Sequence, residues 1–190
     1  MLFGDPKITS VFEKRTRVNL VKDGKKIVVV CSTPEAIKTD LPSLNVDLLE
    51  GLTRRLKRHG IAVVKPDDVA TWMDDNGGDW GSPTELAQQF DADYIVHVDL
   101  NQFDFQKENS PSLYQGRAMG DVVGYRVETV GQRKEAIEDF REVFTSVYPP
   151  LYPIETDRVM AKTFRKRFLD RVSGQLAQLF YDHRASERIQ

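Results

Sequence analysis

The sequence predicts one α/β domain with a mixed sheet of four or five strands, helices mainly on one face, and a long C-terminal helix. Three observations carry this prediction. Residues 92–105 are the longest β-favouring stretch, and their alternating apolar side chains indicate a central strand. Leucines recur at every third or fourth position over residues 44–56, which indicates an amphipathic helix. A second apolar stripe predicts a long helix over residues 156–183.

The first part of the chain alternates strands and helices. We expect residues 1–24 to form an N-terminal arm and residues 25–190 to form the single domain. Residues 25–31 end in an unbroken apolar run, which predicts a strand covered on both sides. Asp40 is the expected N-cap of the leucine-rich helix, which ends at Gly60.

A second strand is expected over residues 61–64, and a capping box at residues 82–85 starts a helix that leads into the central strand. This order favours parallel pairing through right-handed crossovers. In the central strand, alternation separates two faces. One face carries Tyr94, Val96, Val98 and Leu100, and the other carries Ile95, His97, Asp99 and Asn101.

The second part of the chain is richer in strands. Residues 106–112 predict a hairpin loop, and residues 113–130 a long strand. Gly116, Gly120 and Gly124 share one face of that strand, where we expect a helix to pack closely, with an interface to another chain as the alternative. Residues 131–140 are highly charged and are interpreted as loosely helical, with a further strand over residues 143–147.

Composition excludes several classes of protein. The net charge of -2 gives no overall attraction to nucleic acid or anionic membranes. Cys31 is the single cysteine, so an intramolecular disulfide is impossible. No run of about 18 apolar residues is present. The start lacks the pattern of a signal peptide, so the chain is either cytoplasmic, if Met1 is the native start, or a mature fragment of an exported protein.

Motifs that carry chemistry are scarce. His97 and Asp99 are neighbours on one strand face, where a carboxylate can orient an imidazole. A hydrogen-bonded structural pair is the favoured interpretation, and an enzyme that uses this pair is the alternative. We therefore predict no catalytic, cofactor-binding or metal-binding residues. Trp80, His97, Asp99 and Tyr125 are instead the candidates for contact with a partner.

The segments Ile-Ala-Val-Val-Lys-Pro-Asp-Asp-Val at residues 61–69 and Ala-Asp-Tyr-Ile-Val at residues 92–96 carry a resemblance to a known superfamily. The chain resembles the domain shared by the TolB amino-terminal domain, the curli-secretion lipoprotein CsgG and the penicillin-binding-protein activator LpoB. The resemblance covers roughly residues 25–150 and the final helix. The same fold resembles the anticodon-binding domains of transfer-RNA synthetases.

The resemblance implies a function without catalysis. Members of the superfamily are envelope proteins, often lipid-anchored, that bind other envelope components. We therefore expect a protein-binding or assembly module of the periplasm or cell envelope, without cofactors, whose lipid anchor would lie outside this chain. An RNA-binding domain is the alternative that the anticodon-binding resemblance implies, and basic clusters at residues 54–59 and 165–167 are its candidate contacts.

Overall fold

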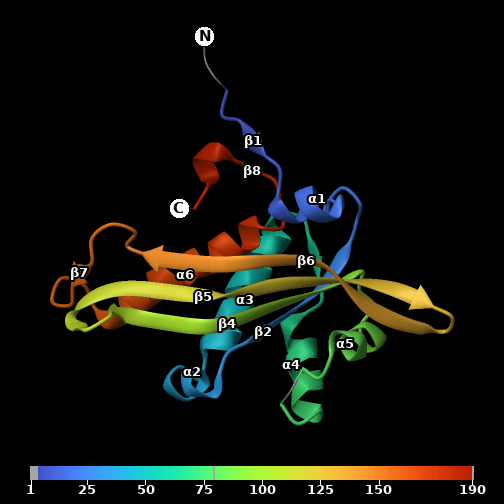
Figure 1. Ribbon diagram of the computed structural model, residues 1–190, viewed down its shortest axis with the longest axis horizontal. Helices are drawn as coiled ribbons and strands as arrows, with labels where there is room; N and C mark the ends of the chain where they lie inside the picture. The colour runs from blue at the N-terminus through green and yellow to red at the C-terminus, as the bar shows by residue number, and fades with distance from the viewer. Residues whose placement is uncertain (1–3, 79, 190) are drawn as a thin grey trace.

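The computed structural model describes residues 4–78 and 80–189 (Figure 1). Its helices are α1 (Val11–Thr16), α2 (Glu35–Asp40), α3 (Leu44–Arg58), α4 (Pro66–Asp75), α5 (Pro83–Gln89) and α6 (Ala161–Gln178). Its strands are β1 (Lys7–Ile8), β2 (Lys26–Ser32), β3 (Ala62–Val63), β4 (Tyr94–Lys107), β5 (Ser110–Val130), β6 (Arg133–Tyr148), β7 (Ile154–Glu155) and β8 (His183–Arg184). A short 3-10 helix over Ala185–Glu187 follows β8.

The main sheet is mixed, as the sequence predicts. Its strand order is β3-β2-β4-β5-β6, and β7 pairs with β5 as a sixth strand. β2 runs parallel to β3 and to β4, whereas β4, β5 and β6 pair antiparallel. The parallel part is the βαβ portion, and the antiparallel part is a long twisted ribbon that crosses the molecule (Figure 1).

The ribbon corrects one prediction. Residues 131–140, interpreted as loosely helical, form the turn and the first half of β6. Their charged side chains suit a strand because most of them remain exposed or half-buried on a hairpin. The predicted hairpin loop at residues 106–112 is shorter than expected, because β4 continues to Lys107 and β5 begins at Ser110.

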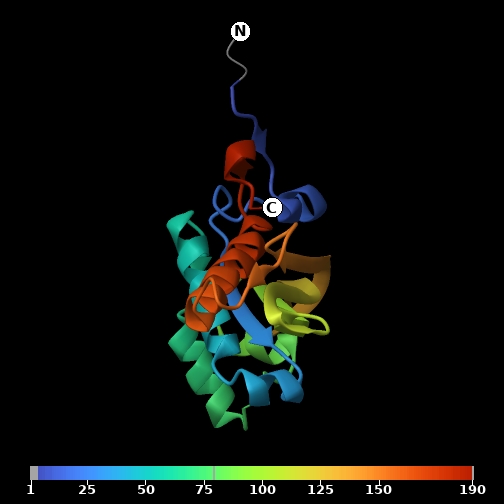
Figure 2. The same ribbon diagram turned by 90° about the vertical axis from the view of Figure 1, so that its left-hand side faces the viewer.

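The larger hydrophobic core lies between the sheet and helices α3 and α6, which run side by side against one sheet face (Figure 2). Tyr94, Val96, Val98 and Leu100 all point into this core, as the alternation predicts. The small-residue face of β5 also meets a helix: a Cβ on Gly116 would lie 2.6 Å from ring atoms of Phe168 in α6. The expectation that a helix packs on these glycines is therefore confirmed at Gly116.

A second, smaller core lies on the opposite sheet face. Val28, Val30 and Ile95 pack there with residues of α4 and α5, such as Val69 and Leu86. Helices thus cover both faces at this end of the sheet, which refines the expectation of helices mainly on one face. The physical reason is that β2 is apolar on both sides, so both of its faces need cover.

The N-terminal segment departs from the predicted arm. Phe12 in α1 is fully buried and contacts the rings of Tyr94, Phe140 and Phe180, so α1 belongs to the core. The chain ends also meet, because β1 pairs antiparallel with β8. The apolar residues of this segment follow no regular spacing. The sequence pattern therefore does not predict that the segment contributes to the core, and this contribution is seen only in the tertiary contacts.

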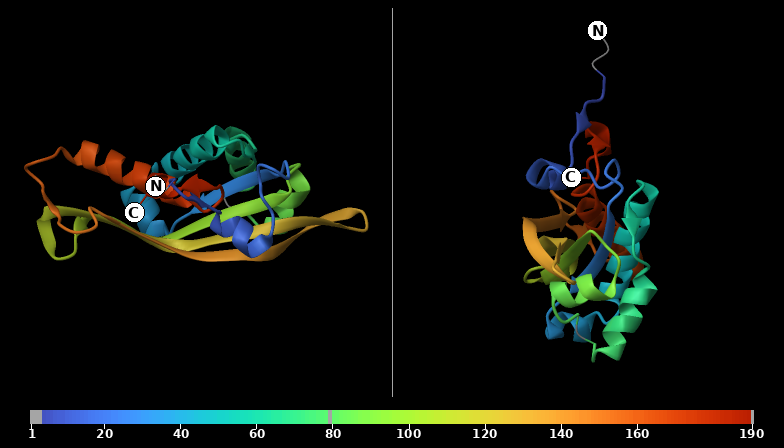
Figure 3. Two further views of the ribbon diagram at one scale, coloured as in Figure 1. Left: turned by 90° about the horizontal axis from the view of Figure 1, so that it is seen from above. Right: turned by 90° about the vertical axis from the view of Figure 1, so that its right-hand side faces the viewer.

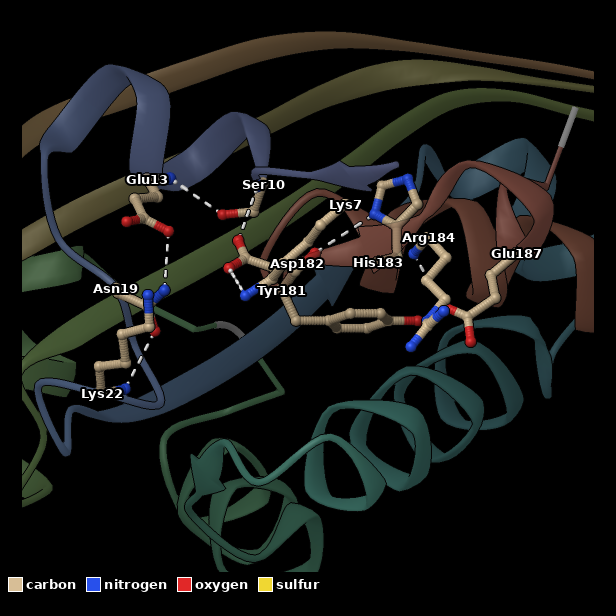
Figure 4. A network of polar contacts seen from close by, with 10 residues as sticks. All are labelled: Lys7, Ser10, Glu13, Asn19, Lys22, Tyr181, Asp182, His183, Arg184 and Glu187. Atoms are coloured by element: carbon tan, nitrogen blue, oxygen red, sulfur yellow. Dashed lines mark hydrogen bonds and ion pairs between the residues drawn. The ribbon is translucent and has the colours of Figure 1, made fainter. Parts of the chain in front are cut away.

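A carboxylate holds this junction together (Figure 4). Asp182 accepts the backbone N–H of Ser10 at 3.0 Å and forms an ion pair with Lys7 at 2.9 Å. Burial opposes ionisation of Asp182, but its contacts with Lys7 and Ser10 outweigh burial and lower the pKa of this carboxyl. We refer to β1, β8 and these three residues as the terminal clasp.

Asp40 is not the N-cap of α3 that the sequence predicts. It is the last residue of the separate short helix α2, and α3 begins at Leu44 after Ser43. Pro42 lies in the break between the two helices, because its ring disfavours a helical conformation at the residue before it. The end of α3 matches the prediction, since Gly60 follows it with a φ of 84°.

Within the described residues, no helix combines the length and the apolar character that crossing a bilayer requires.

Candidate functional site

The candidate residues lie on the sheet face opposite the larger core. Parallel pairing of β2 with β4 places Val30 beside His97 and Ser32 beside Asp99. Antiparallel pairing of β4 with β5 then places Val123 beside His97 and Asp121 beside Asp99. Two neighbouring rows of side chains therefore cross three strands on one face of the sheet.

A hydroxyl joins the predicted imidazole and carboxylate. Ser32 Oγ lies 2.7 Å from His97 Nε2 and donates to Asp99 Oδ1 at 2.8 Å. An ionised carboxylate can only accept, so the single hydroxyl proton goes to Asp99. Ser32 Oγ consequently accepts from His97, which assigns the neutral tautomer with the proton on Nε2.

Burial keeps His97 neutral. Desolvation lowers the pKa of the imidazole and Arg141 lowers it further, whereas Asp99 raises it by a smaller amount than burial removes. The His97 imidazole thus donates to the Ser32 hydroxyl, and the hydroxyl donates to the Asp99 carboxylate. We call this direction of donation the proton order. It is the reverse of the order that activates a serine nucleophile, in which the hydroxyl donates to the imidazole.

Trp80 covers this group. Its indole centroid lies 4.2 Å from the centroid of the His97 ring, with 36° between the ring planes. Trp80 is half-buried and packs against the smaller core. Three of the four predicted partner-contact residues, Trp80, His97 and Asp99, are therefore brought together.

Tyr125 lies on the same sheet face as His97 but is not part of the group formed by Ser32, His97, Asp99 and Trp80. It pairs with Ile95, one side-chain row away from His97, and packs at the border of the smaller core. Burial raises the pKa of its phenol, and the carboxylate of Glu138 raises it further. Glu138 itself is bound by Arg141 through two hydrogen bonds of 2.7 and 2.9 Å.

Sequence reasoning missed Ser32. The predicted strand stopped at Cys31, whereas β2 includes Ser32. Continuing the alternation of Val28 and Val30 by two residues puts Ser32 on their face, and this spacing was the available signal. The pairing with Asp99 could not be read from the sequence, because it depends on the register of β2 against β4.

Beyond the cover of Trp80 the same sheet face is open. Val143 lies beside Asp121 and is 69% exposed, and Met119 and Val147 are exposed farther along the ribbon. We define the open sheet face by its five side chains, Asp99, Met119, Asp121, Val143 and Val147. It combines apolar side chains with two carboxylates that lie side by side, and Arg117 and Arg141 lie on the same face, beside Val147 and Val123.

The larger cavities lie elsewhere. One of about 690 Å³ is lined by Phe103, Tyr114 and Arg117 among others, and one of about 410 Å³ lies between α3 and α6. Across the described parts of the chain, no cluster of three or more histidine, cysteine or acidic side chains is arranged to hold a metal ion. Cys31 is buried, and desolvation raises the pKa of its thiol to about 12.

The basic cluster at residues 54–59 is partly used in the fold. The ring of His59 stacks on Tyr181 with 3.6 Å between centroids. The guanidinium of Arg55 donates to the backbone carbonyl of Asp170 at 2.9 Å. These two side chains are committed to tertiary contacts, which weakens the interpretation of this cluster as an RNA contact.

No protein-family model and no curated protein sequence matches the chain. Among solved structures, a protein from Xanthomonas campestris aligns with a TM-score of 0.47 and 12% identity, over 81% of this chain and 79% of that chain. The lipoprotein GNA1162 of Neisseria meningitidis aligns with a TM-score of 0.44 and 12% identity, over 80% of this chain and 98% of that chain.

A PelC dodecamer subunit of Paraburkholderia phytofirmans aligns with a TM-score of 0.44 and 12% identity, over 93% of this chain and 97% of that chain. Two further matching structures, from Acinetobacter baumannii and Shewanella oneidensis, are also named lipoproteins. All of these TM-scores lie below 0.5, so the likeness is too remote to transfer a function.

Proposed function

We propose that this chain is a non-catalytic binding module of a bacterial cell-envelope assembly, and that a partner protein docks on the open sheet face. The observation that carries the proposal is the exposure of Val143, Met119 and Val147 on one face of the β5–β6 ribbon. Large apolar side chains that gather on one exposed surface favour a contact site. Asp99 and Asp121, together with Arg117 and Arg141 on the same face, suit a partner that surrounds an apolar patch with charges of both signs.

The proton order at Ser32 supports a role without catalysis. Its hydroxyl proton is held by Asp99, and its oxygen accepts from His97, so the group lacks an activated nucleophile. Trp80 lies over the imidazole, where a substrate would have to approach. In our proposal the three polar side chains and Trp80 stiffen the edge of the docking surface.

Support for the envelope comes from the sequence. The segments at residues 61–69 and 92–96 resemble the TolB, CsgG and LpoB superfamily, whose members act in the envelope and are often lipid-anchored.

Site-specific photo-crosslinking in the native bacterium tests the proposal. A photoreactive side chain at position 143 should trap an envelope protein, and the same side chain at exposed position 46 on α3 serves as the matched control. The proposal predicts a discrete partner from position 143 that is absent from position 46. Equal background at both positions, or recovery of the chain only from the cytoplasm, would contradict it.

A further inference from the structure

The connection between β6 and α6 exposes an unusual set of side chains. Leu151, Tyr152 and Met160 are 78%, 81% and 75% exposed, which makes them the three most exposed large hydrophobic residues in the described parts of the chain. The connection projects from one end of the molecule, beside the β4–β5 hairpin (Figure 3). Leu151 and Tyr152 therefore lie on a protruding apolar tip, and Met160 is exposed at the start of α6.

The connection is held firmly at both sides of this tip. Tyr148 packs near Phe164 of α6, with 5.8 Å between ring centroids. Ile154 pairs with Tyr114 of β5, and the N–H of Thr156 donates to the carbonyl of Ser112 at 2.9 Å. The inward side chains are thus anchored while Leu151 and Tyr152 point outward, so their exposure is a feature of an ordered turn.

Positive charge gathers next to the tip. Lys162, Arg165 and Lys166 are exposed and are spaced three and four residues apart, which places them on one face of α6. Among the described residues, none of the three forms an ion pair within 4 Å with a carboxylate.

The position of these cations is unfavourable for the helix itself. The first turns of a helix favour negative charge, yet the first turn of α6 contains no acidic residue. Helix stability therefore does not explain the basic face. Over residues 149–167 the chain carries five basic and two acidic side chains, so this segment is positive although the whole chain is -2.

We propose that this end of the molecule binds the surface of a bilayer that contains anionic lipids. Leu151, Tyr152 and Met160 enter the boundary between headgroups and acyl chains, where an aromatic ring with a polar hydroxyl is favoured. Lys162, Arg165 and Lys166 contact the lipid phosphates, and their long stems allow the charges to reach the headgroups. A protruding apolar tip beside a basic helix face matches this partner better than it matches a flat protein surface.

This surface is separate from the open sheet face. Leu151 and Tyr152 belong to the connection after β6, whereas Val143 and Val147 lie within the strand, although Val147 is only four residues before Leu151. The inference goes beyond the proposed function, and either can hold without the other. Together they would let the chain meet a membrane at one end while its sheet holds a protein.

Vesicle co-sedimentation tests the inference. The full chain should bind vesicles of phosphatidylcholine that contain about 30% phosphatidylglycerol, and should not bind vesicles of phosphatidylcholine alone. Replacing both tip residues, Leu151→Ser with Tyr152→Ser, should weaken binding by about tenfold or more. The matched control is Val143→Ser, which removes an exposed apolar side chain from the open sheet face and should bind as the wild type does.

Charge is tested in the same assay. Lys162→Glu with Lys166→Glu should abolish binding to the anionic vesicles, whereas Lys57→Glu with Arg58→Glu, at the end of α3, should leave it unchanged. In the wild type, raising the salt to about 0.5 M should weaken binding strongly. Absence of wild-type binding at low salt, or equal binding by the Leu151→Ser, Tyr152→Ser variant, would overturn the inference. Equal loss in the Val143→Ser control would overturn it too, because the contact would then not belong to the tip.

Discussion

The indole ring of Trp80 lies over the imidazole of His97, with 4.2 Å between the two ring centroids. This contact joins a residue from the loop between α4 and α5 to the central strand β4. It removes water from one side of the imidazole while Ser32 occupies its Nε2. The protonation of His97 is therefore linked to the position of the Trp80 side chain.

Trp80→Ala should raise the pKa of His97 toward its ordinary value, because water regains access to the ring and desolvation is the main cause of the lowered pKa. The measurement is an NMR titration of the imidazole Cε1–H resonance. Trp72→Ala is the control, since Trp72 packs edge-on against Phe90 and belongs to α4. An unchanged His97 titration in Trp80→Ala would contradict the assigned cause.

The lowered pKa of His97 also predicts how stability depends on pH. The unfolded chain takes up a proton near pH 6.5, whereas the folded chain resists protonation until the pH is lower. The free energy of unfolding should therefore be fully maintained above about pH 6.5 and should fall as the pH drops from there through the folded pKa. Urea unfolding of the wild type and of His97→Gln between about pH 5 and pH 8 measures this. The account fails at this point if both proteins show the same slope in that window.

Gly116→Ala should destabilise the fold by about 1–3 kcal/mol, because the added Cβ would press against the Phe168 ring. Gly4→Ala is the matched control, since a Cβ there meets no atom within 4 Å. The penalty at Gly116 should be smaller in a Phe168→Leu background, where the smaller side chain yields space. Identical penalties in both backgrounds, measured by urea unfolding, would exclude this contact as the cause.

Asp182→Ala should loosen the terminal clasp. It removes the acceptor for the Ser10 N–H and the partner of Lys7, at a cost of about 1–2 kcal/mol. Amide hydrogen exchange should become faster over residues 7–16. Asp182→Asn keeps a neutral acceptor and should show a smaller effect. Asp91→Ala, which loses only an exposed ion pair with Lys134, should leave exchange unchanged, and equal effects in all three variants would refute the clasp.

The elements that the sequence predicts best are those with one uninterrupted periodicity. The alternation of Tyr94, Val96 and Val98 predicts the buried face of β4 correctly, and the spacing of Phe164, Phe168 and Val172 predicts that of α6. These side chains all lie against the larger core, which is one extensive contact surface. Periodicity reports that surface directly.

The elements that the sequence predicts poorly depend on partners that are distant in the chain. Residues 133–140 are a strand because they pair with β5 over a long hairpin, and their charged side chains carry no apolar alternation. Phe12 belongs to a short segment without regular apolar spacing, and its burial depends on Tyr94, Phe140 and Phe180. Long-range pairing overrides local preference at both places.

In the candidate site, too, some contacts follow from local sequence and others depend on residues that are distant in the chain. His97 and Asp99 are recognisable as neighbours from their spacing, and that part follows from strand geometry alone. Ser32 and Trp80 join them through the register of β2 and the path of the loop before α5. The proton order that opposes a nucleophilic serine therefore emerges only from the assembled structure.

The most direct test of the open sheet face is amide hydrogen exchange on the complex with the partner trapped from position 143. The chain alone and the complex are compared peptide by peptide. Our account predicts slower exchange in the complex over residues 119–123 and 143–147, with no change over residues 44–58 of α3. Protection confined to α3, or no protection of the β5–β6 ribbon, would contradict it.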